Sequence, residues 1–261
     1  MRIITLHDID NEMEMFDGFV DTQSEAADSL SATFECSGYN AIALFNTYGI
    51  TATVTISTYG NPFPYTFPFV FGDTTATTAL YSKTVNLGRD KIEDWWDYFF
   101  ATPRYGNSDV VFYFPASEYA TATVTINYPG GTAKCGLCAM GLATECGKTL
   151  QGVKVGISDY SVVETNTFGV SSLSVGTWAK RLDAEGYIET ANFNTLYNKI
   201  VQNRGIPAVY DLNNYAIEIE TGHTSASGLQ SLILYGYAAD FDPSIEINSH
   251  ITFGIEVNGL I

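Results

Sequence analysis

The chain has 261 residues, enough for one large β domain or for two domains of ordinary size. With 46% hydrophobic and only 16% charged residues, it can bury a core, but it must cover its surface mainly with Thr, Ser, Asn, Gly and Tyr. The formal net charge of -17 argues against a broad nucleic-acid-binding face, because such a face needs basic side chains to neutralise phosphates.

The N-terminal segment does not predict a signal peptide. Residues 1–10 lack the positively charged stretch and the long apolar run of a signal peptide. No apolar run in the sequence approaches the ~18 residues of a membrane helix. We therefore expect a protein that is made in the cytoplasm without a signal peptide and that does not insert into a membrane.

Strand patterns dominate the first half of the chain. Residues 52–57 alternate, with Val54 and Ile56 on one side and threonines on the other, and residues 120–126 repeat the pattern. Such alternation of β-branched residues is typical of a strand with one buried face. Residues 110–114 form a more continuous apolar strand that ends at a proline. Short strands of this kind predict an all-β sandwich.

A proline-rich run between these strands carries five aromatic side chains at alternate positions: Phe63, Tyr65, Phe67, Phe69 and Phe71. In an extended segment, alternate side chains point to the same side, so the rings would form one apolar face. Prolines remove backbone donors, which favours an edge strand or an arm. We expect residues 62–71 to contact a neighbouring subunit. The alternative is that they cover the core of their own chain.

A second aromatic cluster falls in residues 91–100, where the apolar residues have helical spacing and the acidic residues point outward. Trp95, Trp96 and Tyr98 could form a platform on which a glycan stacks. We favour the other interpretation, in which the cluster closes the open end of the sandwich as part of its core, because large aromatic side chains dominate core packing.

Four cysteines, Cys36, Cys135, Cys138 and Cys146, are the candidates for a thiolate metal site. One Cys-x-x-Cys pair is present, but a zinc ribbon needs two such pairs. A disulfide is a second possibility. Buried free thiols are common among small residues of glycine-rich strands, and we favour that interpretation. We therefore expect no cofactor and no metal.

The sequence shows no motif for nucleophilic catalysis, and its paired carboxylates are not distinctive among 29 acidic residues, although the two carboxylates of a glycosidase need not be close in sequence. None of the three histidines, His7, His223 and His250, lies near a Ser or Cys nucleophile motif, and there is no Gly-x-Ser-x-Gly turn. The acidic residues near the N-terminus lack the spacing of a calcium-binding loop. We expect a protein that is not an enzyme.

The character of the sequence changes after a glycine-rich stretch that ends near Gly147. We place a domain boundary there, with a β-sandwich over residues 1–147 and a smaller β domain over residues 148–261. A new strand opens the second domain at residues 153–161. Two more strands, within residues 232–241 and 251–261, close the chain.

One helix is predicted in the second domain, over residues 190–204. Phe193, Leu196, Tyr197 and Ile200 share a face of this helix, and we expect that face to be buried against a sheet. Thr190 is the expected N-cap, and Gly205 the expected stop.

Several blocks of the sequence resemble bacteriophage tail proteins. The first part is similar to a jelly-roll module of the galactose-binding-like type, through residues 40–46, 54–56, 81–85, 94–100 and 124–126. The second part is similar to a tail-tube or distal-tail domain, through residues 156–161, 179–181, 190–210 and the closing strand with its Gly259-Leu260 pair. The run 61–78 does not match.

The resemblance implies a non-enzymatic virion protein of a phage tail, assembling into a ring at the distal tail or adaptor region. Its expected partners are copies of itself and other tail proteins, and its location is the tail of the virion. The alternative is a carbohydrate-binding module that recognises host-surface glycans.

Overall fold

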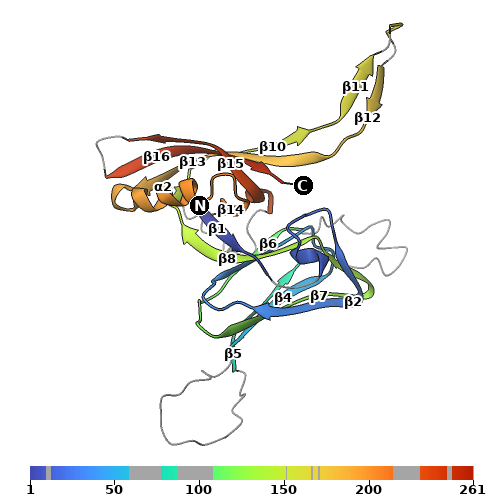
Figure 1. Ribbon diagram of the computed structural model, residues 1–261, viewed down its shortest axis with the longest axis vertical. Helices are drawn as coiled ribbons and strands as arrows, with labels where there is room; N and C mark the ends of the chain where they lie inside the picture. The colour runs from blue at the N-terminus through green and yellow to red at the C-terminus, as the bar shows by residue number, and fades with distance from the viewer. Residues whose placement is uncertain are drawn as a thin grey trace, which may run out of the picture. The chain divides into compact units, whose positions relative to one another are not determined.

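The computed structural model describes residues 1–9, 13–58, 78–87, 108–150, 152–165, 167–169, 171–213, 230–245 and 249–260. Within these residues the protein is mainly β, as predicted, with antiparallel strands and a single α-helix (Figure 1).

Two compact units make up the chain. The N-terminal unit comprises His7–Ala143, whereas Met1–Leu6 belongs with the residues from Thr144 onward in the C-terminal unit. These bounds differ from the expected division after residue 147. The first strand of the chain is the reason, because it pairs with a strand more than 200 residues away: Ile3 lies opposite Tyr210.

Four strands form one sheet of the N-terminal unit, in the order β2 (Ser24–Glu35), β7 (Ala120–Cys135), β4 (Thr51–Thr58) and β5 (Thr78–Asn86). Three more pair in the order β8 (Leu137–Glu145), β3 (Ala41–Phe45) and β6 (Val110–Tyr113). Burial alternates along β4 and along the first half of β7, as the sequence predicted.

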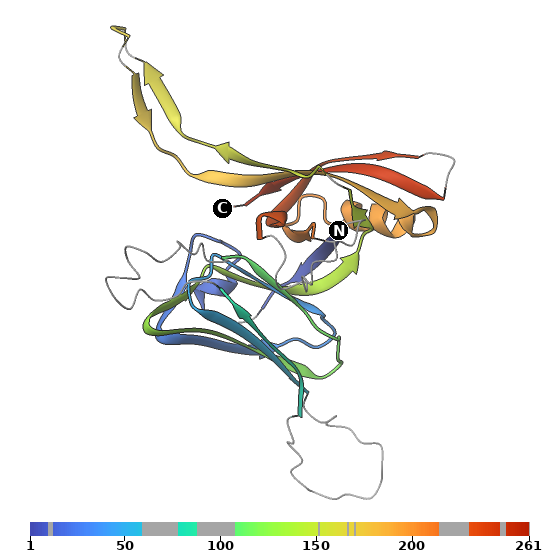
Figure 2. The ribbon, with the colours of Figure 1, turned by 180° about the vertical axis from the view of Figure 1, so that it is seen from behind.

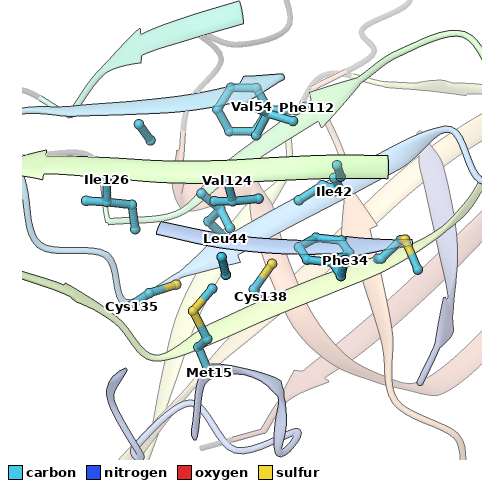
Figure 3. Packing of buried hydrophobic residues seen from close by; sticks show 14 of the residues in the cluster. Met15, Phe34, Ile42, Leu44, Val54, Phe112, Val124, Ile126, Cys135 and Cys138 are labelled. Atoms are coloured by element: carbon cyan, nitrogen blue, oxygen red, sulfur yellow. The ribbon is translucent and has the colours of Figure 1, made fainter. Parts of the chain in front are cut away.

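Side chains from both sets of strands share one hydrophobic core. Figure 3 shows the residues that meet there: Phe34, Val54, Val124 and Ile126 from the four-stranded sheet, and Ile42, Leu44 and Phe112 from the other strands. A short 3-10 helix, η1 (Glu14–Phe16), adds Met15 and Phe16 to this core. Each such side chain stabilises the unit by about 1.5–3 kcal/mol when fully buried.

Six strands form the sheet of the C-terminal unit, in the order β10 (Lys154–Asp159), β13 (Trp178–Glu189), β16 (His250–Gly259), β15 (Ile233–Ser244), β14 (Ala208–Asp211) and β1 (Arg2–His7). The short β9 (Lys148–Thr149) pairs with β13, and a 3-10 helix, η3 (Gln230–Leu232), precedes β15. The two expected closing strands are confirmed. Burial alternates along β16, so only one of its faces contributes to the core.

The expected helix is confirmed as a 3-10 turn, η2 (Thr190–Asn192), followed by α2 (Phe193–Gln202). Leu196 is completely buried in the core of the C-terminal unit, and Ile200 packs at its margin. The expectation for Tyr197 is wrong, because its side chain is 48% exposed.

The ends of α2 agree with the sequence in part. Thr190 opens the 3-10 turn and is not the N-cap of α2, since Asn192 holds that position without a side-chain cap. The expected stop is confirmed. Gly205 follows the last turn with a φ of +71°, a conformation that glycine adopts without strain.

Candidate functional site

Exposed apolar side chains concentrate in the segment that follows β10. There, β11 (Val162–Thr165) and β12 (Ser171–Ser174) pair with each other as a separate two-stranded sheet. Figures 1 and 2 show this hairpin continuing the β10–β13 pair away from the body of the C-terminal unit. We call residues 155–178 the β arm.

Half of the exposed large hydrophobic side chains in the described residues, nine of eighteen, belong to the β arm: Val155, Ile157, Tyr160, Val162, Val163, Phe168, Leu173, Val175 and Trp178. Phe168, at the tip, is 90% exposed. Single exposed apolar residues are ordinary on a protein surface, but a contiguous apolar patch marks an interaction site.

Both faces of the two-stranded ribbon carry apolar side chains. Val163 lies opposite Leu173, so the two form a cross-strand pair on one face. Val162 points to the other face, because successive side chains of a strand alternate. An isolated two-stranded hairpin is at best marginally stable in water. Docking onto a further surface would therefore stabilise the β arm.

The base of the β arm is bent by a bulge, where Tyr160 and Ser161 face three residues of the returning strand. The Ser161 hydroxyl donates to the Asp159 carboxylate at 2.6 Å and accepts from the Gly176 N–H at 3.0 Å. The first of these hydrogen bonds lowers the pKa of Asp159. A Cβ at Gly176 would lie 2.5 Å from the Tyr160 carbonyl oxygen, so only glycine fits this bend.

Charge is almost absent from the β arm. From residue 161 to residue 178, Glu164 is the only charged side chain, in a chain whose net charge is -17. Two copies of so acidic a protein repel each other at long range. An uncharged arm lets them meet where this repulsion is smallest.

The four cysteines do not form one ligand set. Cys36, Cys135 and Cys138 belong to the core of the N-terminal unit and Cys146 to that of the C-terminal unit, all as free thiols. Figure 3 shows Cys135 and Cys138 among apolar side chains.

Burial also keeps these thiols protonated. It raises the pKa of Cys36 and Cys146 to about 11 and that of Cys135 to about 12. Metals bind the thiolate, which such residues do not offer near neutral pH. Among the described residues, no group of three or more His, Cys, Asp or Glu side chains is placed to hold a metal ion.

The two aromatic surfaces predicted from the sequence lie outside the described residues. These are the glycan platform of Trp95, Trp96 and Tyr98 and the subunit-contact run of Phe63, Tyr65, Phe67, Phe69 and Phe71. Both stay predictions.

The β arm itself was not predicted from the sequence, apart from a strand over residues 153–161. A signal was present: short β-branched runs flank a Thr-Phe-Gly turn, a pattern that favours a hairpin. The pattern does not reveal that the hairpin lacks a covering layer, because alternation normally implies one buried face.

Comparison of the sequence with protein-family models and with characterised proteins found no match. Of the helices that the structure describes, none combines the length and apolar character needed to span a membrane. The β arm is the feature of the described structure that best indicates a function.

Proposed function

We propose that this chain is a non-enzymatic structural subunit of a bacteriophage tail and that copies of it assemble into a ring at the distal tail or adaptor region. The observation that carries the proposal is the β arm, an extended hairpin that exposes nine large hydrophobic side chains. Such a surface suits a protein that forms contacts between the subunits of an assembly.

The physics of association favours this use of the β arm. Covering a large apolar side chain stabilises a complex by up to about 1.5–3 kcal/mol. A hairpin whose base is pinned by the Ser161 hydrogen bonds loses less entropy on docking than a loose loop would. An arm that docks on a different surface of the next copy makes a heterologous contact, the kind that closes into rings.

The assignment to a phage tail rests on the sequence resemblance. In the proposal the N-terminal unit is a galactose-binding-like jelly-roll sandwich, which is supported by its two sets of strands around one core. The C-terminal unit is a tail-tube-like β domain with α2 on its sheet. The alternative, a glycan-binding module, depends on Trp95, Trp96 and Tyr98, and no described residue supports it.

Sedimentation velocity of the purified protein over a wide concentration range tests the ring. We expect wild type to form one closed species, and Val163→Ser combined with Leu173→Ser to shift the protein to monomer. Phe19→Ser is the matched control, since Phe19 is an exposed aromatic residue, 62% accessible, that belongs to the N-terminal unit and is not part of the β arm. A wild-type protein that stays monomeric at every concentration would refute the ring.

Electron microscopy tests the location. Negative-stain images of the purified protein should show rings, and gold-labelled antibodies against it should mark the tails of phage particles that contain it. Labelling confined to heads, or particles without the protein, would rule out a tail role.

A further inference from the structure

We propose that the outer face of α2 is the surface that receives the β arm of the neighbouring copy. The inference rests on the proposed function, because it identifies both sides of the contact that would build the ring. It commits to a second copy of this chain as the partner.

The outer face of α2 carries a compact apolar patch. Tyr197 and Val201 are four residues apart and lie on the same side of the helix, with exposed fractions of 48% and 53%. Ile206, 52% exposed, follows in the turn that ends the helix, where its N–H donates to the Asn203 carbonyl at 3.1 Å. We call these three residues the α2 patch.

The β arm and the α2 patch lie at opposite ends of one strand. The β arm ends where β13 begins, at Trp178, and η2 and α2 follow directly after β13 ends, at Glu189. A strand rises about 3.3 Å per residue, so the two ends of β13 are about 35 Å apart. Figures 1 and 2 both show α2 at the end of the sheet away from the β arm. The β arm therefore cannot cover the α2 patch of its own chain.

This arrangement is the one that a heterologous interface requires. Two complementary surfaces at opposite ends of a subunit allow each copy to give its β arm to one neighbour and to receive that of another. Self-pairing of two β arms would instead be isologous and would stop at a dimer.

Charge supports the pairing. Residues 191–210 contain no acidic side chain, and the charged residues among them are Lys199 and Arg204. This local excess of positive charge, in a chain of net charge -17, suits an approaching arm whose charged residues are Asp159 and Glu164. Charge of opposite sign across an interface guides association and fixes its register.

Four of the other exposed large apolar residues of the described chain make poorer acceptors. Phe19, Leu80 and Leu142 are single residues on separate elements of the N-terminal unit. Leu260 follows Gly259, which contacts the Lys180 backbone at the base of the β arm, so it lies at the wrong end of the sheet.

A mixing experiment tests the inference. The arm variant is Val163→Ser with Leu173→Ser, and the patch variant is Tyr197→Ser with Val201→Ser. Each should weaken self-association by about tenfold or more, as loss of central apolar contacts does. Each variant keeps one working surface, so an equimolar mixture should yield a dimer of twice the 28.5 kDa chain mass and nothing larger. Circular dichroism and thermal melting should show that both variants are folded.

A charge exchange gives a second, independent readout. Glu164→Arg alone and Arg204→Glu alone should each weaken the assembly, and the two together in one chain should restore it. Restoration by the double exchange supports a direct contact between the two side chains, which a merely structural role for either residue does not predict.

The outcomes separate the inference from the proposed function. If the arm variant dissociates while the patch variant assembles like wild type, the β arm docks elsewhere: the inference fails and the ring stands. A mixture that yields no dimer from two folded variants also overturns the inference. If wild type never associates, and the β arm instead binds phosphatidylglycerol vesicles in a flotation assay, both the ring and the α2 patch are wrong.

Discussion

Two exposed β surfaces of this protein carry different kinds of uncharged side chain. The outer face of the four-stranded sheet carries serines and threonines that hydrogen-bond across the strands, as between Thr33 and Thr123 at 3.0 Å and between Thr53 and Thr84 at 2.9 Å. The β arm presents apolar side chains at the equivalent positions, with Val163 opposite Leu173.

The comparison shows that a surface without charge can be stable in water or can favour burial, depending on whether its side chains are polar or apolar. On the sheet, paired hydroxyls satisfy each other and still bond to water, so the surface needs no partner. On the β arm, the side chains have nothing to bond, and burial is their only favourable change. A low content of charged residues therefore indicates an interface only where the uncharged side chains are also apolar.

The strongest effect of pH on stability should come from the two hydrophobic cores rather than from either exposed β surface. Burial raises the pKa of Cys135 from its ordinary value of 9.0 to about 12 and that of Tyr210 from 10.0 to about 12. The unfolded chain releases the Cys135 proton above about pH 9 and the Tyr210 proton above about pH 10, while the folded chain keeps both, so stability is full below pH 9 and falls as pH rises toward 12. Cys135 alone should cost about 2 kcal/mol at about pH 10.5.

Urea unfolding in a reducing buffer, compared at about pH 8 and about pH 10.5, checks this expectation. Cys135→Ala should reduce the pH dependence, although the smaller side chain lowers stability at both pH values. An unfolding free energy that does not change over this range would contradict the assigned burial of the thiols.

Substitutions on the two sides of α2 should affect different properties. Those on the buried side should lower the stability of the fold, and those on the exposed side should weaken assembly. Leu196→Ala leaves a cavity in a completely buried site, so we expect a loss of about 2–5 kcal/mol in the free energy of unfolding. Tyr197→Ala is the control and should change that free energy by only about 0.5 kcal/mol, as exposed substitutions usually do. Equal losses would mean that Tyr197 packs in the core, and that the α2 patch does not exist.

The bend at the base of the β arm should control the geometry of the assembly. Gly176→Ala forces the Tyr160 backbone to move, because the added Cβ would come within 2.5 Å of its carbonyl oxygen. The apolar side chains remain, so we expect copies still to associate but fewer rings to close, with open chains visible in negative stain. Rings of normal size and yield would show that the direction of the β arm is set elsewhere.

The smallest effect is expected on the hydroxyl-paired sheet. Thr53→Val with Thr84→Val replaces both partners by side chains of the same shape, which is nearly neutral for stability, about 0.5 kcal/mol or less. The new apolar pair should not promote ring formation, because the α2 patch is complementary to an extended arm. Chemical denaturation and sedimentation measure the two quantities. Strong association of this variant would show that any exposed apolar β surface is sufficient.

Much of the local structure could be predicted from the sequence. Alternation located β4 and β7, and the spacing of Leu196 and Ile200 located α2, because these signals act over a few residues. Tyr197 was placed wrongly, since the buried stripe on α2 is narrower than the run of apolar residues on the helix. The β arm was missed because exposure depends on whether another layer covers a hairpin. Local sequence carries no information about that layer.

The pairing of β1 with β14 has a consequence for the order in which the protein can fold. Ile4 lies opposite Val209, so β1 leaves the ribosome about 200 residues before the strand with which it pairs. The N-terminal unit, His7–Ala143, is synthesised entirely within that interval and can fold while the strand before it is still unpaired. During that time Met1 and Ile3, both later buried in the C-terminal core, face water or a chaperone. The β arm emerges before β14, so the surface proposed for assembly is exposed before the sheet of the C-terminal unit is complete.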